Sequence, residues 1–105
     1  MSARDLRDVP DGRMVRHCGI VTLRQQPPTA KGTTFITLED ETGVVQVICW
    51  KAVREAQRAV LLGSRLLAVY GRWQREGDVM NLIAQKLVDL TPLLGSLATT
   101  SRDFK

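Results

Sequence analysis

The sequence has few of the residues that most often build catalytic and metal sites. It contains one histidine and two cysteines, and Cys18 and Cys49 lie in apolar stretches with no second thiol at metal-binding spacing. We therefore expect two buried, reduced thiols, no metal site and no cofactor. There is no Gly-x-Ser-x-Gly motif, and Lys31 and Gly32 lack the upstream glycine and following helix of a phosphate-binding loop. The sequence thus predicts no catalytic residue, and no enzyme activity for this chain alone.

Long apolar runs are also missing. No stretch approaches the roughly 18 apolar residues that span a membrane, and the charged N-terminus, MSARDLRDVPDG, has no signal-peptide core. We therefore expect a cytoplasmic protein with no membrane partner. With 105 residues, 44% of them hydrophobic and 25% charged, the composition is typical of one soluble globular domain.

Positive charge is present in modest excess and is unevenly distributed. The formal net charge is +4. Residues 1–32 hold six basic and three acidic side chains, residues 33–50 hold three acidic and no basic ones, and residues 51–75 hold six basic ones and only Glu55. Basic surfaces attract phosphate backbones, although many such surfaces are simply solvated. Charge alone therefore leaves nucleic acid as one candidate partner among others.

Period-two alternation predicts a first strand over Arg13–Gln26. Its expected inward residues are Val15, Gly19, Val21 and Leu23, and its expected outward residues are Arg16, Thr22 and Arg24. The glycine inside this strand indicates a bend or a bulge, as strongly coiled barrel strands need.

The remaining pattern gives four more strands and one helix. The expected strands are Thr33–Asp40, Val44–Trp50, Arg65–Trp73 and Val79–Leu90, the last with a second half that could instead be helical. The expected helix is Lys51–Leu62, with Val53, Ala56 and Val60 on one face and Gly63 at its end. Turns are expected at Glu41–Gly43 and Arg75–Asp78, and a loop at Pro27–Gly32.

This order of elements predicts an all-β fold, a five-stranded Greek-key barrel of the OB type with one α-helix between strands 3 and 4. An SH3-like barrel is the competing fold, but it usually lacks a helix of this length at this place. We expect residues 1–12 to form a lead-in segment, residues 13–90 the barrel, and residues 91–105 a tail.

An acidic cluster, Glu39 to Glu41, marks the expected turn between the second and third strands. Such carboxylates can bind a metal, but their place before Thr42 and Gly43 favours a structural role. In that role Asp40 accepts backbone N–H bonds and Gly43 takes a positive φ.

Ligands of OB barrels bind the outer face of strands two and three, between the loop joining strands one and two and the loop joining strands four and five. Alternation assigns two sets of side chains to these strands. The expected core set is Ile36, Leu38, Val45 and Val47. The expected outer set is Phe35, Thr37, Gln46 and Ile48. Phe35 could then stack on a base and Gln46 hydrogen-bond to one, unless the alternation is out by one residue and Phe35 lies in the core.

Basic side chains are expected to flank this face. The candidates are Arg24 and Lys31 near the first loop, Arg75 near the second, and Arg16 and Arg72 on neighbouring strands. Each can contact a phosphate or stack on a base, and each taken singly could equally be solvated surface charge. Trp50 and Trp73 lie at strand ends, where tryptophan more often closes a core than binds a base.

A resemblance to bacterial error-prone DNA polymerases, of the alpha-subunit-like C family, lies in the run VPDGRMVRHCGIVTLRQQPPTAKGTTFITLEDETGVVQVICW. The pattern continues in LLGSRLLAVYGRWQREGDVMNLIAQKLVDL, and SRDF near the end is similar to that family's C-terminus. The resemblance implies a C-terminal OB module that holds single-stranded DNA during damage-induced mutagenesis and translesion synthesis. The family's catalytic domains and polymerase carboxylates are absent, so this chain alone is not expected to polymerise DNA.

More distantly, F.TLEDETG.VQV resembles the anticodon-binding OB domain of aspartyl- and lysyl-type tRNA synthetases. The aromatic and the glutamine of that pattern read bases in those proteins, and they fall on Phe35 and Gln46 here. His17 and Cys18 depart from the polymerase family, which usually has smaller apolar residues at these places.

The sequence is compatible with three functions. The first is binding of single-stranded DNA, or of RNA, with Phe35, Gln46 and the basic side chains as contacts. The second is docking of polymerase accessory proteins or a sliding clamp, for which the tail offers the side chains of Leu93, Leu94, Leu97 and Phe104. The third is tRNA binding, which would show as a preference for a structured RNA loop over single-stranded DNA.

Overall fold

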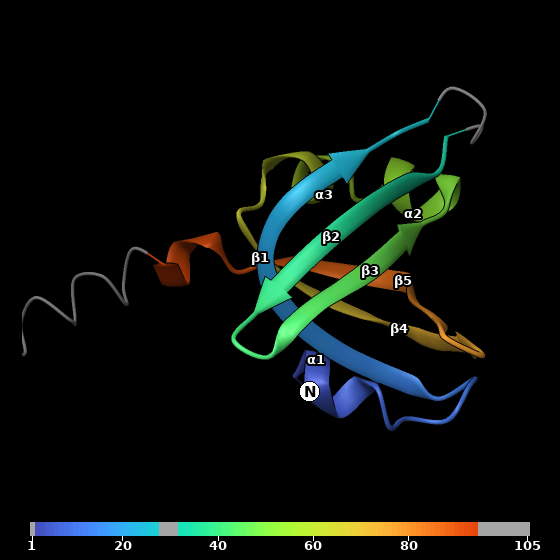
Figure 1. The fold of residues 1–105 in the computed structure, drawn as a ribbon. Coiled ribbons are helices and arrows are strands. Elements are labelled where there is room, and N and C mark those ends of the chain that lie inside the picture. Colours follow the sequence, from blue (N-terminus) through green and yellow to red (C-terminus); the bar gives the residue numbers. More distant parts are fainter. Residues whose placement is uncertain (1, 28–31, 95–105) are drawn as a thin grey trace, which may run out of the picture.

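The computed structural model describes residues 2–27 and 32–94, and strands dominate it (Figure 1). The elements in chain order are α1 (Ala3–Leu6), β1 (Met14–Gln25), β2 (Thr34–Asp40), β3 (Gly43–Cys49), α2 (Lys51–Ala56), α3 (Arg58–Gly63), β4 (Leu66–Glu76) and β5 (Val79–Asp89). All five expected strands are present, and the last is a strand along its whole length rather than partly helical.

The five strands close into a barrel in the order β1-β2-β3-β5-β4. β1 is long and strongly curved, so that its first half pairs with β4 and its second half with β2 (Figure 1). β3 and β5 are parallel, whereas the other neighbouring strands are antiparallel. The predicted all-β, five-stranded Greek-key barrel is therefore confirmed.

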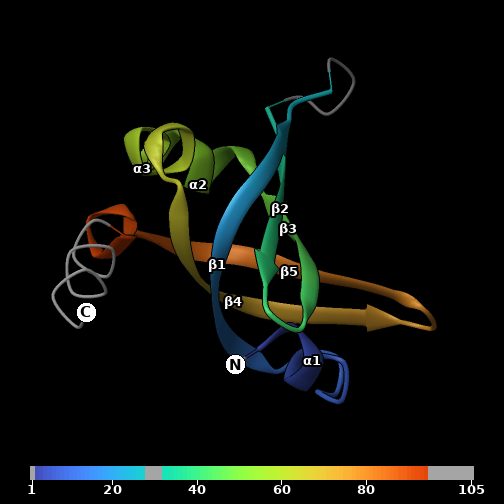
Figure 2. The same ribbon diagram turned by 60° about the vertical axis from the view of Figure 1, so that its left-hand side comes forward.

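Apolar side chains fill the barrel, and helices cover its two ends. Figures 1 and 2 place α1 at one end, and α2 with α3 at the other. The fully buried side chains contributed by the strands include Ile36, Leu38, Val47, Leu67, Val69 and Leu82. Burying each such side chain contributes about 1.5–3 kcal/mol to the free energy of folding. Because alternate residues of a strand point to opposite faces, burial of this set also fixes which side chains lie on the outer face.

The lead-in segment takes part in this core. Leu6 is fully buried, and Ala3 and Val9 are nearly so. A capping box starts α1, in which Ser2 and Asp5 each accept the other's backbone N–H. The first residues therefore do more than precede the barrel, since their apolar side chains close one of its ends.

A bulge changes the two faces of β1. The register against β2 shifts between Val21 and Leu23, just beyond Gly19. An extra residue exchanges the inward and outward positions from that point on. Leu23 is 48% exposed for this reason, and the expectation that it points inward is wrong.

Arg24 lies beyond the bulge and is directed to the helices instead. It pairs in register with the core residue Ile36. Its Nε donates to the carbonyl oxygen of Leu61 at 2.8 Å, and its Nη2 donates to that of Ser64. Both acceptors lie in the last turn of α3 or just after it, where unpaired carbonyls favour a cation. Arg24 therefore ties β1 to the end of α3.

The expected helix between β3 and β4 is divided in two at Gln57. The φ of −127° and ψ of 35° at this residue are not helical. Its side-chain amide pairs with the backbone of Leu87 in β5, donating at 2.6 Å and accepting at 2.8 Å. Ala56, just before the break, is exposed, and Leu61, after it, is buried, so the apolar face predicted for one continuous helix is wrong at Ala56. Gly63 ends the second helix, as expected.

Asp40 joins the β2–β3 hairpin to α1. Its Oδ1 accepts from the Thr42 N–H at 2.7 Å, the Thr42 hydroxyl at 2.8 Å and the Gly43 N–H at 3.1 Å. Its Oδ2 accepts from the Ala3 N–H at 2.7 Å. The φ of Gly43 is +152°. The structural role predicted for Asp40 and the positive φ predicted for Gly43 are both confirmed.

The Asp40 carboxylate is expected to make stability depend on pH below about pH 4. Desolvation raises its pKa, but hydrogen bonds from Ala3 and Thr42 outweigh this and lower the pKa from 3.8 to about 2. A lowered carboxyl pKa contributes stability above the unfolded-state pKa, and this contribution disappears as the pH falls towards about 2. Because the group is partly exposed, Asp40→Asn should cost about 1 kcal/mol at neutral pH. Urea unfolding of both proteins should show the difference shrinking at acid pH, and a pH-independent difference would contradict a role for the charge.

The two cysteines lie in different environments. Both are free thiols. Cys49 is buried, and burial raises its pKa to about 12, so the thiol is neutral near pH 7. Cys18 is exposed on the outer side of β1, between the buried residues His17 and Gly19, and the expectation that it is buried is wrong. Among residues 2–27 and 32–94, no helix has the length and apolar character to cross a membrane.

Candidate nucleic-acid interface

The outer face of β2 and β3 presents four side chains, which we call the platform: Phe35, Thr37, Gln46 and Ile48. Phe35 pairs in register with Ile48, and Thr37 with Gln46. The Thr37 hydroxyl lies 3.2 Å from Oε1 of Gln46, to which it donates. Gln46 is exposed and the other three are partly exposed. Ile36, Leu38, Val45 and Val47 are buried, so the predicted assignment of inner and outer positions is confirmed.

β1 places two further residues beside the platform, and the sequence pattern did not indicate them. Beyond the bulge, Leu23 pairs with Thr37 and Gln25 with Phe35. Both side chains are exposed. Because directly opposed residues share one face of a sheet, Leu23 and Gln25 lie beside the platform. A bulge placed from the sequence at this point would have found them.

β5 and β4 continue the outer row on the other side. Ile48 pairs with Ile83 of β5, and Ile83 pairs with Arg72 of β4. The row therefore runs across the barrel from Phe35 through two isoleucines to a guanidinium group. Among the predicted cations that the structure describes, Arg72 is the one that the register places in line with Phe35.

A groove opens where this row meets the end of β3. It is lined by Trp50, Ile83, Arg72, Gln74 and Asp11, and its volume is about 310 Å³. Trp50 is 54% exposed, whereas Trp73 is 3% exposed and lies in the core. The expectation that strand-end tryptophans close the core is correct for Trp73 and wrong for Trp50.

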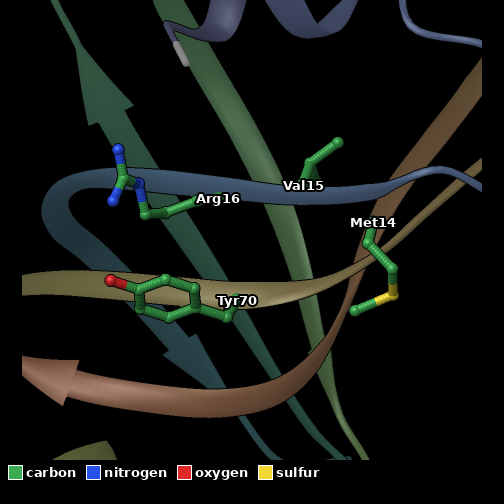
Figure 3. Close-up of a pocket in the computed structure, with 4 residues that line it drawn as sticks. All are labelled: Met14, Val15, Arg16 and Tyr70. Atoms are coloured by element: carbon green, nitrogen blue, oxygen red, sulfur yellow. The ribbon is translucent and has the colours of Figure 1, made fainter.

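Arg16 lies on a different part of the surface, shown in Figure 3. It pairs with Tyr70 across β1 and β4, and its guanidinium carbon is 5.9 Å from the centre of the Tyr70 ring. Together with Met14 and Val15 these residues line a shallow pocket, in which the Arg16 and Tyr70 side chains lie side by side (Figure 3). This geometry is that of a cation–π contact. The structure therefore does not bring Arg16 together with Phe35.

The other predicted cations have separate positions. Arg75 is exposed near the β4–β5 turn, and its backbone N–H donates to Oδ1 of Asp11 at 2.7 Å. Alternation along β4 directs its side chain away from the side that carries Arg72 and Gln74. Arg24 is bound to α3, as described above. Lys31 lies outside the described residues.

In the described part of the chain, no three His, Cys, Asp or Glu side chains are grouped closely enough to hold a metal ion. The outer face carries instead an aromatic ring, aliphatic side chains, amide groups and, in the same row, one guanidinium group. Flat apolar side chains accept the face of a base, and amides and guanidinium groups bind base edges and phosphates.

Comparison with known proteins gives a family and a set of relatives. A family model described as an OB-fold nucleic acid binding domain matches residues 15–90. The error-prone DNA polymerase of Ralstonia nicotianae is 55% identical over 99% of this chain, and that of Pseudomonas fluorescens is 57% identical over 98%. The chain spans only 10% of the length of each of these relatives. The predicted resemblance to error-prone DNA polymerases is confirmed.

Solved structures share the fold at low sequence identity. Asparaginyl-tRNA synthetase from Pyrococcus horikoshii aligns with a TM-score of 0.72 and 20% identity, over 87% of this chain and 23% of its own. The hypothetical protein ygiW from E. coli aligns with a TM-score of 0.65 and 8% identity, over 86% of this chain and 88% of its own. Because the family match extends across all five strands of the barrel, the chain belongs to the OB-fold nucleic acid binding domains.

Proposed function

We propose that this chain binds single-stranded DNA on the platform, as one module of an error-prone DNA polymerase. The observation that carries the proposal is the outward position of Phe35, which is partly exposed beside Ile48 and opposite Gln25. An aromatic ring in this setting offers one face to a base, and stacking on such a ring contributes about 1–3 kcal/mol per base.

The polar groups around Phe35 suit contacts to unpaired bases. Gln46 is exposed and carries both donors and an acceptor, so it can pair with the edge of any base. The Thr37 hydroxyl holds one end of this amide and so orients it. Because stacking accepts every base, we expect weak sequence preference and a strong dependence of affinity on salt.

The proposal for the parent protein comes from its relatives. Proteins 50–57% identical to this chain are named error-prone DNA polymerase, and the chain corresponds to 10% of their length. Template binding beside a polymerase active site is consistent with that name. We assign to this chain the binding of DNA and not the polymerase reaction itself.

Fluorescence anisotropy with a labelled strand of about 20 nucleotides tests the proposal, since one OB fold covers about 4–16 nucleotides. Phe35→Ala should weaken binding by about 1–3 kcal/mol at low salt, and the wild-type affinity should fall steeply as salt rises. Tyr70→Ala is the matched aromatic control, because Tyr70 is 36% exposed on the face that carries Arg16.

Three results would count against the proposal. Equal losses in Phe35→Ala and Tyr70→Ala would mean that binding is not specific to the platform. Preference for a structured RNA loop over single-stranded DNA would favour a tRNA-type ligand. No binding at low salt would leave docking of a protein partner as the function of the barrel.

A further inference from the structure

The groove at the end of β3 is a second surface feature, and none of its lining residues belongs to the platform. Its lining comes from three separate places in the chain: Asp11 in the lead-in segment, Trp50 after β3, and Ile83 with Arg72 and Gln74 on the β5–β4 pair. Its volume of about 310 Å³ lies at the lower end of the range of small-ligand pockets, roughly 300–1,000 Å³. It is thus of a size for one base rather than for a large ligand.

Trp50 lines this groove, and its backbone position is held by the strand before it and the helix after it. It follows β3 directly and is the N-cap residue of α2, with its carbonyl oxygen accepting the Arg54 N–H at 3.0 Å. Its side chain nevertheless stays 54% exposed. An exposed indole on a rigid element, beside the isoleucine Ile83, offers an apolar surface that is already in place for stacking.

The other wall of the groove is also held in place. The Gly12 N–H donates to the Trp73 carbonyl and the Trp73 N–H to the Arg13 carbonyl, both at 2.7 Å, so the lead-in segment runs along β4. Asp11 is fixed in turn by accepting the Arg75 backbone N–H. The groove therefore needs little ordering when a ligand enters, which favours affinity.

The lining of the groove favours a base over a phosphate beside Trp50. Asp11 repels phosphate oxygens, whereas the indole of Trp50 and the side chain of Ile83 present apolar surface. Within residues 2–27 and 32–94, the Arg72 guanidinium makes no hydrogen bond or ion pair, so its donors are available for a phosphate or a base edge. Gln74 supplies an amide that can pair with a base edge.

We propose that this groove is a second base-binding site, in which one unpaired base stacks on Trp50 while Arg72 contacts its phosphate or its edge. The proposal rests on the proposed function, because the groove continues the row that begins at Phe35 and passes through Ile48 and Ile83. A strand bound in this way crosses the barrel from β2 towards β4, with one base near Phe35 and another on Trp50.

Tryptophan fluorescence gives a direct readout of this site. The chain has two tryptophans, and Trp73 is buried in the core. Titration of the whole chain with an unlabelled oligodeoxyadenylate of about 10 nucleotides at low salt should quench the emission of Trp50, in parallel with binding measured by anisotropy. Trp50→Ala should lose this quenching and weaken binding about 5- to 100-fold, whereas Trp50→Phe should retain most of the affinity because a ring remains.

Leu62→Ala is the matched control, since Leu62 is 51% exposed on α3, outside both sites, and its loss should leave affinity unchanged. Circular dichroism of each variant verifies that the barrel is folded. If Phe35→Ala loses affinity while Trp50→Ala binds and quenches like the wild type, the groove proposal is overturned and the platform stands. If Trp50→Ala loses affinity while Phe35→Ala does not, the groove stands and the platform falls. If the wild type does not bind at low salt, both fall.

Discussion

Gly71→Ala is expected to lower the free energy of unfolding by about 3 kcal/mol or more, or to prevent folding. Gly71 is buried in β4, where the register against β5 shifts between Tyr70 and Gly71. A Cβ at this position would collide with the carbonyl oxygen of Ile83 and lie 2.8 Å from its carbonyl carbon. These are backbone atoms that cannot rotate away, so β4 and β5 would have to separate. Urea unfolding followed by circular dichroism measures the effect.

Gly63→Ala is the matched control for this prediction. Gly63 ends α3, and no atom lies within 4 Å of the position that its Cβ would take. The same chemical change should therefore alter stability by less than about 1 kcal/mol, and it should favour the helix slightly. If both variants were equally stable, the close approach of β4 and β5 at Gly71 would not be a requirement of the fold.

The parts of this fold that could be predicted are those that local rules determine. Alternation in β2 and β3 places Ile36 and Val47 in the core and Phe35 and Gln46 outside, because one buried face fixes the register of a hairpin. The turn between the two strands could be predicted for a similar reason, since Asp40 accepts hydrogen bonds there from Thr42 and Gly43, which follow it closely in the chain. These rules place the platform without any knowledge of the rest of the barrel.

The residues around the platform could not be placed in this way, because their positions depend on contacts between distant segments. The bulge in β1 reverses the faces beyond Val21, turning Arg24 towards α3 and bringing Leu23 to the outer surface. Alternation contains no signal for an inserted residue, and Gly19 indicates a bulge without fixing where the register shifts. The break at Gln57 is similar, since it is stabilised by the backbone of Leu87, which lies 30 residues further along the chain.

The two tryptophans show the same limit most clearly. Both end a predicted strand, and local pattern gives them the same expected role. β4 in fact continues beyond Trp73 to Glu76, Gly12 and Arg13 hydrogen-bond to the backbone of Trp73, and the Trp73 side chain is buried in the core. Trp50 leaves its strand at the start of α2 and remains exposed. The candidate groove follows from this difference in tertiary contacts.

Leu6→Ala is expected to lower the free energy of unfolding by about 2–4 kcal/mol, as truncation of a buried leucine usually does. Leu6 is fully buried at the end of the barrel that α1 covers, with Ala3 and Val9 beside it in the core cluster. Removal of its side chain leaves a cavity that the capped α1 cannot easily fill, since Asp40 holds the Ala3 N–H at 2.7 Å. Urea unfolding of wild type and variant measures the loss directly.

Leu62→Ala is the same substitution at a site that is 51% exposed, and it should cost less than about 0.5 kcal/mol. A large loss for Leu6→Ala with a small one for Leu62→Ala would mean that the lead-in segment is part of the folding unit. The groove would then depend on it too, because Asp11 and Gly12 follow α1 and hydrogen-bond with β4. Equal, small losses would mean that the barrel is stable without α1, and that the Asp11 wall of the groove is held by its bonds to β4 alone.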